Sequence, residues 1–365
     1  MGTSVRSSER PQAPVRTGAT MDSEHSQFIL RPLEQARALW TATCARSDNV
    51  TLYHGVRWVR GLVKTYRMKP WVAALSDDEG LAAACLLAHT RRPFPAGRFI
   101  GLPFSDVCPP LARDTQALAS LLDALARNPA TRNGCELRGV SAPSPWCTVD
   151  CFANWALDLT RPLNEIERSF DRDFRRKIRR GGEAGLTIQR GDDTSFVVRF
   201  YELQLETRRR LGLPAQPVGL FMALREIFKR NDFEVWLASH DGHDLAGAIL
   251  LRECGRIYMK WSARRLDAIA SANHLLVWNV IQAYAGNATC LDLGRTDVRN
   301  NGLSRFKKEA GAVATPVAYS FLPAAPRHVS SEVLIGWRKL IAQVWRHLPL
   351  PFARLAGAAF YRYLA

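Results

Sequence analysis

Residues 290–311 decide the fold, and they read Cys-Leu-Asp-Leu-Gly-Arg-Thr-Asp-Val-Arg-Asn-Asn-Gly-Leu-Ser-Arg-Phe-Lys-Lys-Glu-Ala-Gly. The pattern predicts a short apolar strand that ends at Asp292, a sharp turn at Gly294 and a polar loop through Asn301. A basic helix that carries Lys307 should follow. The stretch is therefore expected to form a strand, a loop and a helix, with charged side chains where the strand ends.

The charged side chains of this loop are candidates for ligand binding. In open α/β sheets, ligands sit beyond the carboxyl ends of the strands. Asp292, Arg295 and Asp297 fall at that place in the predicted unit, so a pocket is expected beside them. From this segment alone, a solvated rim of charges is an equally good interpretation.

Composition sets limits on size, partners and location. The chain has 365 residues, of which 47% are apolar, and this is enough for two domains that each have a core. Fifty Lys and Arg residues against thirty-four Asp and Glu give a net charge of +16, which favours phosphates, anionic lipid or acidic carriers as partners. No apolar run approaches the ~18 residues of a membrane span. The cytoplasm is therefore the expected location.

The eight cysteines are scattered along the chain, and several lie in apolar runs as core residues do. Only Cys147 and Cys151 are close together, and no second pair of Cys or His stands at zinc spacing. We therefore expect no metal site. A nucleophilic Cys-His pair stays open as an alternative, although no local context favours it.

Four segments follow from the pattern. Residues 1–25 are rich in Ser, Thr, Pro, Arg and Gly and are expected to be a disordered lead-in. Residues 26–160 and 161–325 each alternate strands with helices, which predicts a mixed α/β fold in two domains. The predicted helices span 33–45, 54–66, 115–127, 194–210, 219–230 and 272–284, and the predicted strands span 71–75, 81–88, 135–140, 155–159, 233–239, 245–252, 256–261 and 289–293.

Residues 326–365 are expected to form a basic amphipathic tail. One helical face collects the apolar residues, and Arg338, Lys339 and Arg346 lie toward the other side. Such a helix can lie in the interface of an anionic membrane, or it can dock on the second domain of its own chain. The apolar face consists of Leu334, Trp337, Ile341, Val344, Trp345 and Leu348.

Several segments together resemble the FemAB-like branch of the GNAT acyltransferase superfamily. The resemblance rests on Asp292-Leu-Gly-Arg, on Gly302-Leu-Ser-Arg-Phe-Lys and, upstream, on Pro103-Phe-Ser-Asp-Val-Cys-Pro-Pro-Leu. Tyr258–Trp261 and the segment that begins at Ser271 correspond to the same branch, in the same order. The likeness covers most of the chain and implies two tandem GNAT-like domains of the exopolysaccharide- or exosortase-associated type.

The resemblance implies acyl or aminoacyl transfer to an amine or hydroxyl of a cell-envelope or exopolysaccharide precursor, at the cytoplasmic face of the membrane. No tightly bound cofactor is expected, and acyl-CoA or aminoacyl-tRNA would be the donor. One alternative is an aminoacyl-tRNA-dependent ligase that builds peptidoglycan bridges. Another is a non-catalytic GNAT scaffold that binds a lipid-linked saccharide.

The resemblance also suggests roles for single residues. Acyl transfer needs a stabilised oxyanion, and Lys307 resembles the lysine that serves this need in aminoacyl-transferring relatives. Its neighbour Lys308 points about 100° around the helix and should be solvated. For the aromatic candidates named below, the alternative role is packing in the core or between the domains. For the arginines near residues 175–179, the alternative is a solvated helix surface without a ligand. The candidate substrate-binding residues are Asp106, Arg175, Arg176, Arg179, Tyr258, Trp261, Asp292, Arg295 and Phe306.

The donor site is the most degraded part of the resemblance. GNAT enzymes bind the CoA pyrophosphate on a glycine-bearing loop at a helix N-terminus, and residues 264–273 contain no glycine. An N-cap is the ordinary role of Ser271 or Asn273. Residues 172–180 are expected to form a short basic helix with six Arg and Lys residues. No DNA-binding or RNA-binding motif accompanies it, so tRNA stays a possible partner and DNA is not expected. The general base and the oligomeric state are left open. The candidate cofactor-binding residues are Arg264, Arg265, Asn273 and His274.

Overall fold

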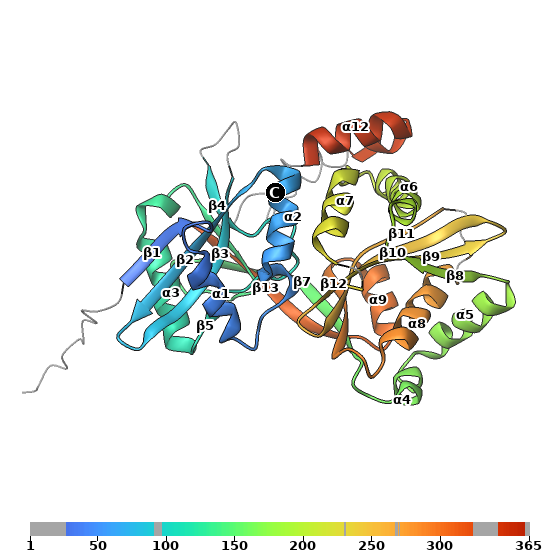
Figure 1. Cartoon of the computed structure of the whole chain (residues 1–365), viewed down its shortest axis with the longest axis horizontal. Helices are drawn as coiled ribbons and strands as arrows, with labels where there is room; N and C mark the ends of the chain where they lie inside the picture. Colours follow the sequence, from blue (N-terminus) through green and yellow to red (C-terminus); the bar gives the residue numbers. More distant parts are fainter. Residues whose placement is uncertain are drawn as a thin grey trace, which may run out of the picture.

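The computed structural model describes residues 27–90, 97–229, 231–266, 269, 271–323 and 342–361. Within these ranges all strands belong to one mixed sheet, with helices packed on its faces (Figure 1). The mixed α/β fold predicted from the sequence is therefore confirmed. The strands follow the order β1-β2-β3-β4-β6-β13-β7-β12-β11-β10-β9-β8, and a short β5 pairs with β3.

The first half of the sheet alternates strands with helices. Asp114 caps α3 by accepting a hydrogen bond from the Ala117 N–H, which explains why this helix begins where the sequence predicts. The elements of this half are β1 (Gln27–Pro32), α1 (Arg37–Ala45), α2 (Val56–Tyr66), β2 (Lys69–Asp77), β3 (Gly80–Thr90), β4 (Arg98–Gly101), β5 (Leu111–Ala112), α3 (Thr115–Arg127), β6 (Cys135–Arg138) and β7 (Cys147–Asp158), with short 3-10 helices at Leu52–His54 and Pro129–Thr131.

The second half has the same kind of order. Asp193 caps α6 by accepting from the Ser195 and Phe196 N–H groups. The elements are α4 (Leu163–Arg168), α5 (Arg172–Glu183), β8 (Thr187–Gly191), α6 (Thr194–Arg210), α7 (Val218–Ile227), β9 (Phe233–His240), β10 (His243–Glu253), β11 (Arg256–Arg264), α8 (Ala272–Tyr284), β12 (Cys290–Asp297), α9 (Asn301–Glu309), β13 (Val313–Leu322) and α12 (Leu350–Phe360).

The two halves repeat one topology. In each, four strands pair antiparallel, and the fourth then pairs parallel with a fifth: β4 with β6, and β11 with β12. Two helices follow the first strand of each half, and one helix separates the fourth strand from the fifth. The parallel pairing is short, and β11 meets β12 only at Ile257↔Leu291 and Tyr258↔Asp292. Beyond these residues the two strands no longer pair, which leaves room for side chains between them.

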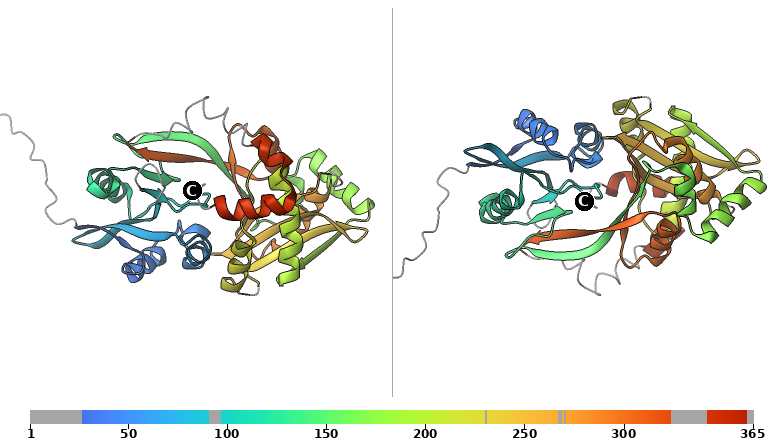
Figure 2. Two further views of the ribbon diagram at one scale, coloured as in Figure 1. Left: turned by 90° about the horizontal axis from the view of Figure 1, so that it is seen from above. Right: turned by 90° about the horizontal axis from the view of Figure 1, so that it is seen from below.

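Two long strands are exchanged between the halves. β7 follows the first half in the chain, yet it pairs antiparallel with β12 of the second half. β13 follows the second half, yet it pairs antiparallel with β6 of the first. The two strands also pair with each other, so the sheet continues across the predicted boundary near residue 160 (Figure 2).

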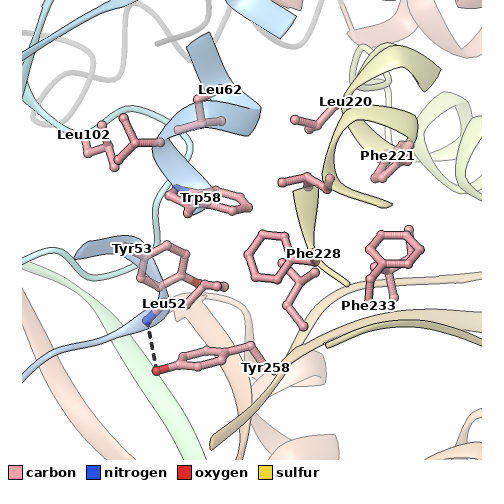
Figure 3. Close-up of a cluster of buried hydrophobic side chains, with 14 of the residues drawn as sticks. Leu52, Tyr53, Trp58, Leu62, Leu102, Leu220, Phe221, Phe228, Phe233 and Tyr258 are labelled. Carbon is pink, nitrogen blue, oxygen red and sulfur yellow. Dashed lines mark hydrogen bonds between the residues drawn. The ribbon is translucent and has the colours of Figure 1, made fainter. Parts of the chain in front are cut away.

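A shared core holds the halves together (Figure 3). Trp58 of α2 is fully buried, and Trp261 packs on both Trp58 and Phe221 of α7, with ring centroids 6.1 and 5.0 Å away. The Leu52 N–H donates to the Tyr258 hydroxyl at 3.1 Å. A Cβ at Gly61 would lie 2.5 Å from Leu224 Cδ2, so glycine lets α2 and α7 approach closely. Because burial of each large apolar side chain contributes about 1.5–3 kcal/mol, this shared core stabilises the contact between the halves.

The structure corrects several predicted boundaries. The opening helix begins at Arg37 rather than at residue 33, and the helix predicted from residue 54 is a 3-10 turn followed by α2. The strand predicted to stop near Asp292 continues to Asp297, because Gly294, at φ +74°, forms a bulge that lets Arg295 resume pairing with β7. The predicted strands gave no sign of β1, β4 or β13. β7 begins at Cys147, eight residues earlier than predicted.

The predicted tail is described only in part. Leu334, Trp337 and Ile341 of the expected apolar face lie outside the described residues, and so does the lead-in 1–25. Residues 342–347 are helical and precede α12, which lies over α7 and α6 (Figure 1). In the part of the chain that the structure describes, no helix has both the length and the apolar character that a bilayer span requires.

Candidate functional site

A bulge in β11 presents Lys260 between the two halves. β10 pairs Ile249 with Trp261 and Leu250 with Met259, so Lys260 has no partner on β10. A bulge of this kind redirects the side chain of the extra residue. Lys260 is thus a cation flanked by the apolar and aromatic residues Met259 and Trp261 in the middle of β11.

Lys260 meets Asp106, which follows β4 in the first half. Its Nζ donates to Asp106 Oδ2 at 2.8 Å and to the Tyr53 hydroxyl at 3.3 Å, while Tyr53 donates to the same carboxylate oxygen at 2.6 Å. Burial lowers the pKa of Lys260, and the charge of Asp106 opposes that shift. Burial raises the pKa of Asp106, but Lys260 and Arg295 outweigh it, so the net pKa lies below its ordinary value. The two cations therefore favour the charged form of Asp106, and its carboxylate favours the charged form of Lys260.

Arg295 of β12 lies on the other side of the carboxylate. Its Nε lies 3.5 Å from Asp106 Oδ1, and its guanidinium also donates to the Tyr319 hydroxyl. The guanidinium stacks over the Phe152 ring at 4.3 Å. Two cations from the second half therefore hold one carboxylate from the first.

Lys307 is buried beneath the bulge of β12. Its Nζ donates to the carbonyl oxygen of Gly294 at 2.8 Å and to that of Arg295 at 3.4 Å. Burial lowers the pKa of Lys307 to about 8, against the opposing charges of Asp106 and Asp292. Phe306 keeps α9 in place, because its ring packs on the rings of Phe174 and His274, with centroids 5.7 and 5.1 Å away.

Gly294 connects these groups. A Cβ at this position would lie 3.3 Å from Asp106 Oδ2, while the Gly294 carbonyl binds Lys307. Asp292 shapes the bulge by accepting from the Gly294 N–H at 2.7 Å and from Asn154 at 2.9 Å. Burial raises the pKa of Asp292 despite these two hydrogen bonds. Asp292 therefore positions the bulge on which the site is built.

A cavity of about 360 Å³ opens beside Lys260. It is walled by both halves and by Tyr361, which follows α12 and stacks on Phe104 with ring centroids 5.2 Å apart. Four cations and one carboxylate line it, together with aromatic rings, so it suits an anionic ligand with a flat or apolar part. The charged lining residues are Asp106, Arg138, Arg208, Lys260 and Arg295, and the aromatic ones are Tyr66, Phe104, Trp261 and Tyr361.

The structure brings some of the predicted substrate residues together and leaves others apart. Asp106, Arg295 and Trp261 line the cavity. Tyr258 instead packs at the boundary of the halves, where its ring lies edge-on to Tyr53. Phe306 supports α9 from below, as described above. Three of these predicted substrate-binding residues therefore line the cavity, and two pack elsewhere and support the fold.

The arginines of α5 lie elsewhere, on a helix at the far side of the second half (Figure 1). Arg176 pairs with Asp173 at 2.9 Å and Arg179 pairs with Glu183 at 3.6 Å, and Arg175 is exposed. They do not line the cavity. Their surroundings are those of a solvated helix surface.

The candidate donor residues surround the start of α8. Arg264 is exposed, and Arg265 pairs with Glu206 at 3.5 Å. Asn273 is half-buried in the first turn, whereas His274 is buried between Phe174 and Phe306. Residues 267, 268 and 270 lie outside the described ranges.

The start of α8 suits an anion in one respect. Ser271 occupies the N-cap position, but its side chain makes no capping bond, and its buried Oγ has no hydrogen-bond partner among the described groups. The sequence predicted that Ser271 would cap α8, but its side chain does not form the capping hydrogen bond. Uncapped N–H groups at a helix N-terminus favour phosphate, as a CoA pyrophosphate would require.

Lys260, Tyr53, Arg138 and Arg208 were missed by the sequence interpretation. A single lysine within the aromatic strand Tyr258–Trp261 was the one signal that could have pointed to the site. The others become site residues only when the halves meet. Among the described residues, no three His, Cys, Asp or Glu side chains gather closely enough to hold a metal ion.

Comparison with known proteins extends this description. Residues 168–308 match the family model of the acetyltransferase (GNAT) domain. A crystal structure of FemX superposes with a TM-score of 0.59 at 16% identity, over 78% of this chain and 95% of FemX. L-PGS from Bacillus licheniformis superposes with a TM-score of 0.51 at 13% identity, over 84% of this chain and 96% of L-PGS. No curated protein sequence matches the chain.

At these identities, the two superpositions show a shared fold. The family match covers the second half from α5 to α9, which contains Lys260, Asp292, Arg295 and Lys307. The superposition on FemX is wider than this match and takes in both halves of the chain. Residues 168–308 are therefore similar to the GNAT acetyltransferase domain, and the chain shares its fold of two tandem halves with FemX.

Proposed function

We propose that the protein transfers an acyl or aminoacyl group to an amine or hydroxyl of an anionic cell-envelope or exopolysaccharide precursor, at the cytoplasmic face of the membrane. One observation carries the proposal. Lys260 and Asp106, from the two halves of the chain, pair in the wall of a cavity lined by cations, and Lys307 binds the carbonyl of Gly294 at the bulge beside Asp106. The resemblance to FemAB-like enzymes supports the envelope precursor as acceptor.

Lys307 would stabilise the oxyanion of the tetrahedral intermediate. Its ammonium has three N–H groups, and two of them donate to the carbonyls of Gly294 and Arg295. The third has no partner in the described part of the chain. A fixed cation with one remaining donor, in a site of low dielectric, favours the developing negative charge.

The cavity would hold the anionic acceptor. Arg138 is partly neutralised by Glu136 at 2.8 Å, and Asp106 balances Lys260. Arg208 forms no ion pair with a described residue and donates only to the Pro214 carbonyl, at 3.0 Å. Its charge is therefore available to a carboxylate or a phosphate.

Two features support different donors. The uncapped start of α8 favours the pyrophosphate of an acyl-CoA. The exposed cations of α5 favour the alternative donor, aminoacyl-tRNA, because Arg172, Arg175 and Arg180 form no ion pair with a described residue. With this second donor the protein would be an aminoacyl-tRNA-dependent ligase of peptidoglycan bridges.

The donor can be tested by thermal stabilisation, since a ligand that binds only the native state raises the apparent stability. The purified chain is melted with acetyl-CoA, with longer acyl-CoAs and with an aminoacyl-tRNA mimic. A shift with CoA thioesters alone supports the acyl-CoA reaction, and a shift with the tRNA mimic alone supports the ligase. No shift with any donor would support a non-catalytic scaffold.

Turnover with the stabilising donor then tests the role of Lys307. Lys307→Met is expected to lower kcat by about 10²–10³-fold, as the loss of one oxyanion donor does. Lys308→Met is the matched control, because Lys308 is the exposed neighbour on the same helix. Equal turnover in the two variants would overturn the assigned role.

A further inference from the structure

The C-terminal helix α12 packs small residues against the second half and exposes two large apolar residues, although Leu350 at its start packs on the core. Ala353 is buried, and at Gly357 a Cβ would lie 2.6 Å from the Ala215 carbonyl oxygen, so small residues permit close contact with the second half. Phe352 and Leu355, in contrast, are 61% and 69% exposed. A helix that only docked on its own chain would turn its large apolar side chains inward.

Neighbouring segments extend this apolar surface. Gly212 lies directly against Ala342, which brings the loop after α6 beside the helical residues 342–347. Leu211 and Leu213 of that loop are 50% and 41% exposed, and Val344 is 59% exposed. We call the group the α12 surface; it consists of Leu211, Leu213, Val344, Phe352 and Leu355.

The two chain segments that carry the α12 surface contain cations and no carboxylates. Residues 207–217, from the end of α6 through the following loop, contain Arg209 and Arg210 in addition to the cavity residue Arg208, and no Asp or Glu. Residues 342–365 also contain no Asp or Glu, and they include Arg346 and Arg354, which are exposed. Exposed large apolar side chains on segments that carry arginines and no carboxylates are the composition that binds an anionic lipid interface. A surface that binds a protein partner more often carries charges of both signs.

The position of the surface relates it to the candidate site. Tyr361, directly after α12, stacks on Phe104 and Tyr66 and lines the cavity that contains Lys260. Viewed from above, α12 lies across the junction side of the second half (Figure 2). A membrane bound to the α12 surface would therefore lie next to the cavity.

We propose that the α12 surface docks the protein on an anionic lipid bilayer, by insertion of Phe352 and Leu355 and by attraction of the surrounding arginines. The docking does not depend on acyl transfer. It can therefore be measured without donor or acceptor, and its failure is distinct from a failure of the proposed function.

The test is sedimentation of the full chain with vesicles, either of phosphatidylcholine or of an equimolar mixture of phosphatidylcholine and phosphatidylglycerol. The wild-type chain should bind the anionic vesicles and not the neutral ones, and high salt should weaken the binding. The double variant Phe352→Ser, Leu355→Ser should bind at least about tenfold more weakly, because two large apolar groups no longer enter the interface. Its melting temperature should stay unchanged, because both side chains are exposed.

Val313→Ser is the matched control, because Val313 is 71% exposed and lies on β13, outside the α12 surface. It should bind as the wild-type chain does. Equal binding of the double variant and this control would overturn the proposal, as would a wild-type chain that does not prefer anionic vesicles. A wild-type dimer that the double variant converts to a monomer, with vesicle binding unchanged, would assign the surface to a second copy and would equally overturn it.

Discussion

Lys260 of the second half and Asp106 of the first half form a buried ion pair, with Nζ and Oδ2 2.8 Å apart. The two residues are far apart in the chain. Lys260 lies on β11, the fourth strand of the second half, and Asp106 lies in the loop after β4, the fourth strand of the first half. Each therefore completes the environment of the other only when the halves are joined. The candidate site is for this reason also a joint between the halves.

This pair predicts a strong coupling in stability. Asp106→Asn leaves the charge of Lys260 buried without its partner, which should lower the free energy of unfolding by about 3–5 kcal/mol. Lys260→Met removes the second charge, so the double variant should recover a large part of that loss. Urea unfolding of both single variants and the double variant measures the coupling. Strictly additive losses would contradict a direct interaction.

Gly294 predicts an effect on activity that can be separated from its effect on stability. Gly294→Ala forces a Cβ into a backbone at φ +74°, which costs about 1–2 kcal/mol, and it places that Cβ against Asp106 Oδ2. Gly286 has the same φ with no atom nearby, so Gly286→Ala is the matched control. Both variants should unfold at lower urea concentrations, but only Gly294→Ala should lose turnover. A full loss in the control would show that backbone strain alone impairs activity.

The sequence predicted α3, α6 and α8 well, since caps such as Asp114 and Asp193 and the periodicity of apolar residues are local signals. It also indicated the loop around Arg295 and the helix that carries Lys307. The exchange of β7 and β13 could not be predicted, because strand pairing depends on contacts remote in the chain. Periodicity placed the end of β12 at Asp292 because a bulge interrupts the alternation of the strand.

The same physical reason explains which site residues were missed. Lys260 enters the site because a bulge redirects it, and Arg138 and Arg208 enter because the two halves meet. The opposite error arose on α5, where a cluster of arginines is conspicuous in the sequence. That helix lies on the outer side of the second half, so local charge density was a poor guide to the cavity.

The lowered pKa of Lys307 predicts how turnover depends on pH. A lysine with a pKa of about 8 is protonated below pH 8 and neutral above it. If the ammonium stabilises the oxyanion, kcat should fall as pH rises through about 8, and Lys307→Arg should move this fall beyond the measured range. A pH profile of kcat between pH 6 and pH 10 checks the sign, and a rise through pH 8 would indicate a general base instead.

The unpaired Arg208 predicts how the acceptor is held. Arg208 lines the cavity and has no ion pair with a described residue, whereas Arg209 follows it on α6 and does not line the cavity. Arg208→Gln should raise the KM for an anionic acceptor about tenfold, in line with the ~1.5–3 kcal/mol of a hydrogen bond to a charged group, and should change kcat little. Arg209→Gln should leave both constants near those of the wild-type chain. Added salt should raise the wild-type KM and reduce the difference between the two variants, because screening weakens the same attraction that the substitution removes. An equal KM in both variants would place the anionic group of the acceptor away from Arg208.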